Sequence, residues 1–207
     1  MRRIVATVLI SLVVFTPLGI AIAEGETTPV LSDVGAYSID ARAARISALK
    51  EQFKISLSDK EKTLVSSRCV GAQGELRKIS TRLLVTSKER EVSYSSAILN
   101  LIQLKSALEA KHTDTSNIDL LIVLYQQKKT SFDTAILAYE LSLEDVVSID
   151  CVHNPDDFRA ALEGVRSARK PVVDASSQIR EITRSNLKTT FDSILIRLQT
   201  EDSGHGE

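Results

Sequence analysis

Tryptophan is absent from these 207 residues, and aromatic side chains make up only 4% of them. A core must therefore be built from Leu, Ile, Val and Ala, which suits helices packed on helices. Helix breakers are also scarce, since residues 36–199 hold only three of the eight glycines and two of the four prolines. These few breakers mark the joints between helices. No stretch alternates apolar and polar residues as a half-buried strand would, so we expect an all-α protein.

A strong charge of one sign is missing as well. The chain has 26 basic and 27 acidic residues, mixed along its length. A nucleic-acid-binding protein would show a basic face or stripe. We therefore expect no nucleic-acid partner.

The residues that carry most enzyme chemistry are few. Three histidines and two cysteines leave little material for a metal site. There is no glycine-rich phosphate loop, no His-Glu-x-x-His and no Asp-x-Asp calcium loop. Glu109 and His112 have the Glu-x-x-His spacing of di-iron bundles. Such a site needs a second pair at the same height in the bundle, and the sequence does not offer one there. We expect no cofactor, no metal and no enzymatic activity.

The first 23 residues have the order of a secretory signal peptide. Arg2 and Arg3 precede the uncharged apolar run at 4–15, and Ala21-Ile22-Ala23 offers a small-x-small cleavage site. We expect export to the periplasm, the cell surface or the medium, with cleavage after Ala23. The alternative is an uncleaved anchor, because residues 4–23 approach the roughly 20 apolar residues that a span needs. No second apolar span follows, so no membrane span is expected after cleavage.

Hydrophobic periodicity predicts long amphipathic helices in the rest of the chain. We expect residues 24–35 to be a flexible polar linker, 36–200 a single helical-bundle domain and 201–207 a disordered tail. Apolar residues recur every three or four positions over about 37–68, 75–112, 117–149 and 155–199. Such sustained steps predict an antiparallel bundle of three to four long helices with coiled-coil-like packing. The apolar stripes are wide enough to form a core within one chain or an interface between two copies. The sequence therefore leaves open whether the protein forms a homo-oligomer.

The joints between these segments have identifiable signals. Residues 69–74, with two glycines in four residues, form either a turn or part of a bent continuous helix. A Ser58-x-x-Glu61 capping box makes a kink near residues 56–58 a second option. Asn154 is expected to cap the last helix, with Pro155 in its first position. Pro171 is expected to kink that helix rather than end it.

The two cysteines are expected to meet. Whether 69–74 is a turn or part of a helix, antiparallel packing brings Cys69 and Cys151 to the same end of the bundle. An oxidising compartment then favours a disulfide that closes a loop of 82 residues. The alternative is a reactive or intermolecular thiol, although the redox motif Cys-x-x-Cys is absent.

Three polar residues interrupt the apolar stripes: Arg90, Lys128 and Ser176. One interpretation is that they lie at the edge of a stripe, which their aliphatic stems cover. The other is a polar layer that fixes helix register, or a groove that binds a partner.

The residues around the joints resemble a family of exported bacterial helical proteins with an unassigned role. The shared pattern is Cys-x-x-x-Gln followed later by Asp-Cys-x-x-x-Pro-x-x-Phe. The residues that carry it are Cys69, Gln73, Asp150, Cys151, Pro155 and Phe158. The resemblance implies a helical fold and no catalytic residues.

We therefore expect a non-enzymatic structural or interaction protein of the cell envelope, a scaffold or adaptor with protein partners. The alternative is an extracytoplasmic holdase-type chaperone that binds clients between its helices. That alternative predicts exposed apolar surface or a cavity.

Overall fold

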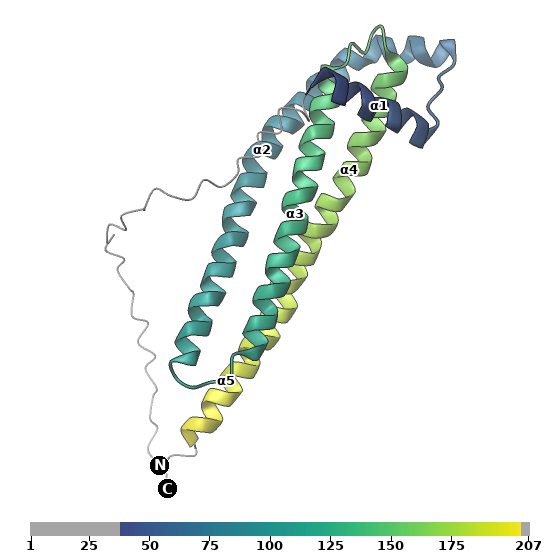
Figure 1. Ribbon diagram of the computed structural model, residues 1–207. Coiled ribbons are helices and arrows are strands. Elements are labelled where there is room, and N and C mark those ends of the chain that lie inside the picture. Colours follow the sequence, from purple (N-terminus) through teal and green to yellow (C-terminus); the bar gives the residue numbers. More distant parts are fainter. Residues whose placement is uncertain (1–37, 204–207) are drawn as a thin grey trace, which may run out of the picture. The chain divides into compact units, whose positions relative to one another are not determined.

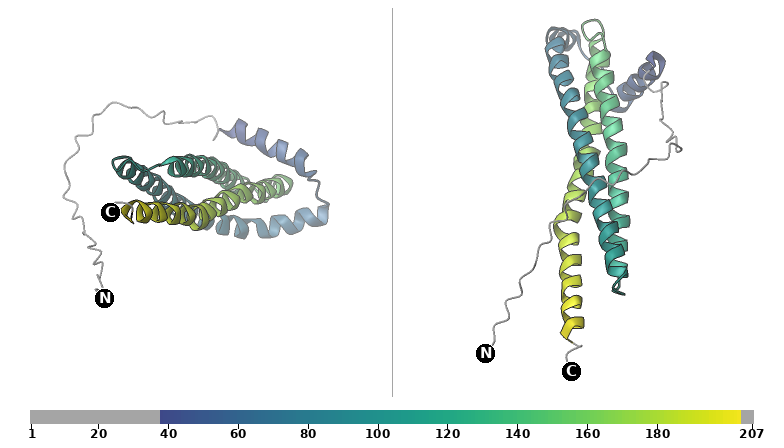
Figure 2. Two further views of the ribbon diagram at one scale, coloured as in Figure 1. Left: turned by 90° about the horizontal axis from the view of Figure 1, so that it is seen from below. Right: turned by 90° about the vertical axis from the view of Figure 1, so that its left-hand side faces the viewer.

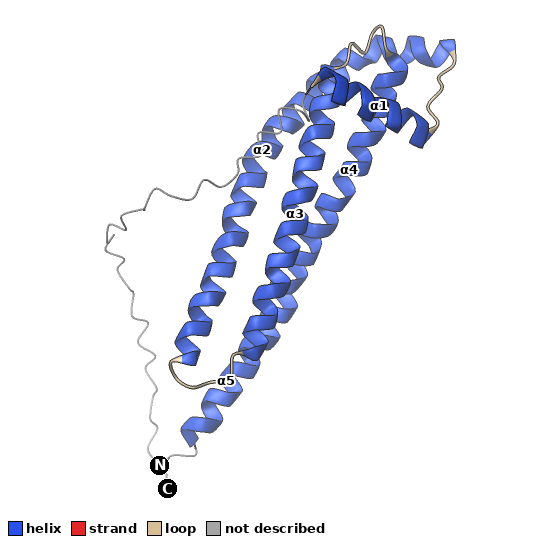
Figure 3. Cartoon of the chain, viewed as in Figure 1, coloured by secondary structure: helices blue, strands red, loops and turns tan. Residues whose placement is uncertain are grey.

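The computed structural model describes residues 38–203, all within one compact unit, Val34–Glu207. The predicted signal peptide and linker lie outside the described residues. In the described part every regular element is helical and no strand occurs, which confirms the all-α prediction (Figure 3). The elements are α1 (Ile39–Phe53), α2 (Asp59–Glu109), α3 (Ser116–Ser148), α4 (Pro155–Glu181), the π-helical turn η1 (Ile182–Asn186) and α5 (Leu187–Ser203). Helix α5 continues into the predicted tail as far as Ser203.

The bundle is antiparallel, with α3 between α2 and the α4–α5 rod (Figure 1). Helix α1 crosses the same end of the bundle as the α3–α4 loop and packs mainly on α4 (Figure 2). No described helix is both long and apolar enough to cross a membrane.

Helix α3 supplies the most regular part of the core. Its buried apolar residues recur every three or four positions, as the sequence predicted. They are Ile118, Leu121, Ile122, Tyr125, Phe132, Ala135, Ile136, Tyr139, Leu143 and Val146. Tyr94 of α2 meets the Phe132 ring edge-on, with ring centroids 5.2 Å apart, and Tyr125 in a similar way at 6.4 Å. Three aromatic rings thus meet where α2 packs on α3.

The first joint lies earlier than the glycines suggested. Helix α1 begins at Ser38, whose Oγ accepts a hydrogen bond from the Ala41 N–H, and ends at Lys54 in the left-handed conformation (φ 50°). Helix α2 begins after Ser58, whose N–H and Oγ both donate to the Glu61 carboxylate. These two hydrogen bonds fix the start of α2.

A turn at residues 69–74 was therefore the wrong alternative. Helix α2 runs without interruption through Gly71 and Gly74, and neither glycine has a positive φ. A glycine inside a helix costs only about 1 kcal/mol relative to alanine. The N-terminal part of α2 instead curves over the end of α3 and α4 (Figure 1).

The α4–α5 rod also continues through its proline. Pro171 lies inside α4, so it does not end the helix, as expected. A second irregularity was not predicted: in η1 the Leu187 N–H bonds to the Ile182 carbonyl, five residues back. The extra residue in this turn shifts the face that α5 presents to α3 relative to α4.

Cys69 and Cys151 form a disulfide, with their Cα atoms 6.0 Å apart. We expect no free thiol when the unfolded, unreduced protein is titrated. We expect replacement of both cysteines by alanine to lower stability by about 4 kcal/mol, since the bond closes a long loop. Thiol titration and thermal unfolding monitored by circular dichroism test this. Two free thiols in the untreated protein would contradict it.

Candidate functional site

The disulfide lies in the interior of the α1 end of the bundle. Cys69 is 1% exposed and Cys151 is 2% exposed. Cys69 lies in α2, whereas Cys151 lies in the short loop between α3 and α4. The bond therefore attaches that loop to α2, and a buried disulfide in this position is structural unless the end opens.

Gln73, one turn after Cys69, completes the attachment. Its buried Nε2 donates to the carbonyl oxygens of Val146 (2.9 Å) and Ile149 (2.8 Å), at the end of α3. Its Oε1 lies 3.4 Å from Cys151 Sγ. The last carbonyls of a helix have no partner within the helix, so Gln73 satisfies groups that would otherwise be buried and unpaired.

The six motif residues are brought together at this end. Pro155 takes the first position of α4 and Phe158 is buried, both as the sequence indicated. Asp150 Oδ2 accepts a hydrogen bond from His153 Nδ1 at 2.7 Å, on the exposed outside of the loop. Asn154 precedes α4 as predicted, but its side chain donates to the Asp150 carbonyl and does not cap the helix.

Acidic residues of the first turn of α4 hold the segment between α1 and α2. Asp156 Oδ1 accepts a hydrogen bond from the Leu57 N–H (2.9 Å), and its other oxygen lies 3.3 Å from Lys62 Nζ. Asp157 pairs with Lys50 of α1 at 2.8 Å. Both carboxylates follow Pro155 directly in the sequence, which does not show that they reach across to another segment.

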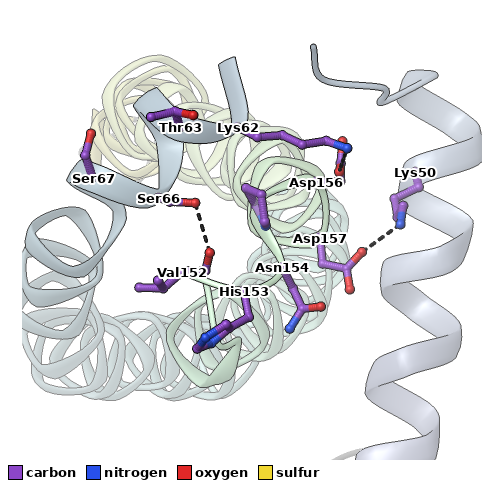
Figure 4. A pocket seen from close by; sticks show the side chains of 11 residues that line it. Lys50, Lys62, Thr63, Ser66, Ser67, Val152, His153, Asn154, Asp156 and Asp157 are labelled. Atoms are coloured by element: carbon purple, nitrogen blue, oxygen red, sulfur yellow. Dashed lines mark hydrogen bonds and ion pairs between the residues drawn. The ribbon is translucent and has the colours of Figure 1, made fainter. Parts of the chain in front are cut away.

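These residues line an open polar pocket of about 740 Å³ (Figure 4). Its lysines come from α1 and α2, and its carboxylates from α4. The Leu57 N–H holds the pKa of Asp156 below its ordinary value of 3.8, and the Asp157 carboxylate raises the pKa of Lys50. The charges are therefore already neutralised in pairs. No group of three or more His, Cys, Asp or Glu side chains suited to a metal occurs among residues 38–203.

A second surface lies on the other side of α1, where one carboxylate is nearly fully buried. Asp145 of α3 is 3% exposed and accepts two hydrogen bonds from Arg45, at 2.7 and 2.6 Å. Arg42 Nε lies 3.6 Å from the same carboxylate. Both arginines belong to α1, so this charge cluster positions α1 on the bundle.

An apolar groove of about 460 Å³ runs beside α1 from this cluster. Small side chains dominate its walls on α3 and α4, and the lining includes Ala138, Leu141, Ala161, Ser167, Ala168 and Pro171. At Gly164 a Cβ atom would come within 2.8 Å of Leu49 Cδ1, so glycine allows the close approach of α1. The groove thus combines an apolar wall with a charged rim.

The sequence did not identify this groove. Asp145 looks like any surface acid next to an apolar stripe, and Ala or Gly positions give no signal of a concave surface. The spacing of Arg42, Arg45 and Leu49 on one face of α1 was the signal that could have pointed to it.

Two of the three stripe-interrupting residues come together. Arg90 Nη1 of α2 donates to Ser176 Oγ of α4 at 3.3 Å, and Ser176 Oγ in turn donates to the Val172 carbonyl. Arg90 is exposed, and Lys128 on α3 is half-buried. This placement fits the edge of a stripe, and a partner groove at these residues stays a prediction.

Comparison with known protein families, curated proteins and solved structures finds no match. The resemblance to exported bacterial helical proteins therefore stays a prediction. What the structure does show is a helical bundle with one bonded cysteine pair.

Replacing Asp145 by alanine should release α1. Removing one member of a buried ion pair leaves its partners uncompensated and costs about 3 kcal/mol. We expect faster hydrogen exchange over residues 39–53 with little change in α3, measured by mass spectrometry. Glu144→Ala, at the exposed neighbouring position, is the matched control and should leave α1 protected. Equal protection of α1 in both variants would contradict the role of Asp145.

The Asp156 contact predicts a pH dependence. A carboxylate whose pKa is lowered by folding adds stability above its ordinary pKa, and this stability is lost as the pH falls through the folded pKa. We expect the difference in unfolding free energy between the natural chain and Asp156→Asn to shrink as the pH falls below 3.8, the ordinary pKa of an aspartate. Urea unfolding at each pH measures it, and a difference that does not change with pH would rule out this contribution.

Proposed function

We propose that this chain is an exported, non-enzymatic interaction protein that acts as a scaffold or adaptor of the cell envelope. The apolar groove beside α1 is the observation that carries the proposal. It lies on a bundle end held by a disulfide, Gln73 and several ion pairs, so its walls keep their positions before any partner arrives. A preorganised surface loses little conformational entropy on binding.

The disulfide supports the cellular location. A bond between Cys69 and Cys151 fits an oxidising compartment. Export through the signal peptide at residues 1–23 is part of the proposal. N-terminal sequencing of the protein recovered from its host tests this part, and a chain beginning at Glu24 is the expected result.

A holdase-type chaperone is the second candidate. Every α-helix among the described residues carries large apolar side chains that are exposed, and monomeric proteins with broad apolar surface commonly bind other proteins. The most exposed examples are Ile39, Val70, Leu120, Val123, Leu137 and Ile196. Such scattered sites would suit many unfolded clients rather than one partner.

Site-specific photo-crosslinking in intact host cells separates the two functions. A photoreactive residue replaces Ser167, which is exposed and lines the groove, or Arg169, which is exposed on the same helix outside the groove. A scaffold should give one major adduct from position 167 and none from position 169. A holdase should give many adducts from both positions. The absence of any adduct at position 167 would remove the groove as the binding surface.

A further inference from the structure

Helix α2 carries two rows of residues spaced alternately by three and four positions. The inward row packs in the core and includes Cys69, Gln73, Leu76, Leu83, Tyr94, Leu101 and Leu108. The second row points outward, roughly 150° around the helix at 100° per residue. Its members are Gly71, Gly74, Lys78, Thr81, Val85, Lys88, Val92, Ser95, Leu99 and Ile102.

The aliphatic members of the outward row are exposed. Val85, Val92 and Leu99 follow each other at seven-residue intervals and are 57%, 60% and 58% exposed. Ile102 continues the row at 41%. A coiled coil repeats apolar residues at two positions of each heptad, and this face has them at one, while the other position holds Gly74, Thr81, Lys88, Ser95 and Ile102. This face of α2 therefore has the spacing of a helix interface without a helix against it in the described part of the chain.

The two glycines of this row have no explanation within one chain. A Cβ atom added at Gly71 or Gly74 would meet nothing within 4 Å, although each glycine costs about 1 kcal/mol of helix stability. Gentle helix curvature does not require glycine. A closely approaching side chain from a second helix would make use of the missing Cβ atoms.

We propose that two copies of this chain pair in an antiparallel way through the outward face of α2. The two-fold axis passes between Thr86 and Ser87. In this register Gly74 faces Leu99 of the second copy, and Gly71 faces Ile102. The largest apolar side chains of the row thus meet glycines, which have no side chain, as in knobs-into-holes packing. Closer to the axis, Thr81 faces Val92, and Val85 packs beside the aliphatic stem of Lys88.

The charges beside the row select this register. Arg82 and Glu89 are exposed, and neither forms an ion pair within residues 38–203. In the antiparallel pair Arg82 lies beside Glu89 of the second copy, and the two-fold axis repeats the contact. A parallel pair would instead set Arg77 beside Arg82 of the second copy, twice, and like charges there oppose pairing.

This pairing goes beyond the proposed function because it uses a different surface. The groove is lined by α1, α3 and α4, whereas the paired face belongs to α2. Self-association and partner capture can therefore succeed or fail separately.

Sedimentation equilibrium of the full-length exported protein tests the proposal with a charge-reversal cycle. The natural chain should show a reversible monomer–dimer equilibrium when its concentration is varied a hundredfold. Arg82→Glu and Glu89→Arg should each weaken the dimer by about tenfold, since each places like charges together at two sites. The double variant should return to within about threefold of the natural chain, because both contacts are restored in reversed order.

Replacement of apolar residues by lysine tests the same face of α2. Leu99→Lys should abolish the dimer, whereas Ile79→Lys, also exposed on α2 but outside the row, should leave it intact. Circular dichroism melting shows that each variant is folded. A monomeric natural chain, a dimer indifferent to Leu99→Lys, or a double variant no better than the single variants would each overturn the proposal.

Discussion

The covalent link between Cys69 and Cys151 is the constraint on which the α1 end of the molecule depends. It holds the α3–α4 loop against α2, and this position brings Gln73 to the last carbonyls of α3. The start of α4 follows directly from the same loop, so its first carboxylates are also fixed. These carboxylates then hold the α1–α2 connection and the end of α1. A bond between two distant parts of the chain thus determines where a short helix docks.

Away from that end, the helices are held together mainly by the packing of apolar side chains. Aliphatic side chains of α2, α3 and the α4–α5 rod form one continuous core, and Phe132 is the largest of its fully buried members. The two kinds of stabilisation serve different surfaces. The polar end creates a groove with a charged rim, whereas the long helices leave an outward row of aliphatic residues on α2. The proposed partner binding and the proposed self-pairing therefore use separate surfaces.

Much of this fold could be predicted from the sequence, and the failures have physical causes. The α3 periodicity and the meeting of the cysteines were predicted correctly, because one row of α3 faces the core and antiparallel helices fix the ends. The exposure of Ile79 could not be predicted, since α2 has apolar residues on two sides and periodicity cannot tell which row faces inward. The choice between a turn and a continuous helix at 69–74 stayed open in the sequence because glycine lowers helix stability only slightly. Asp145 was missed because burial of a single acid depends on what another helix brings to it.

The central claim is that the disulfide holds the α1 end in place, whereas the long helices stay folded without it. Hydrogen exchange measured by mass spectrometry on the oxidised and the reduced protein tests this most directly. We predict that reduction removes protection from α1, from the first turns of α2 and from the α3–α4 loop, while residues 118–139 of α3 keep theirs. An even loss of protection along the whole chain, or no loss at α1, would contradict the account.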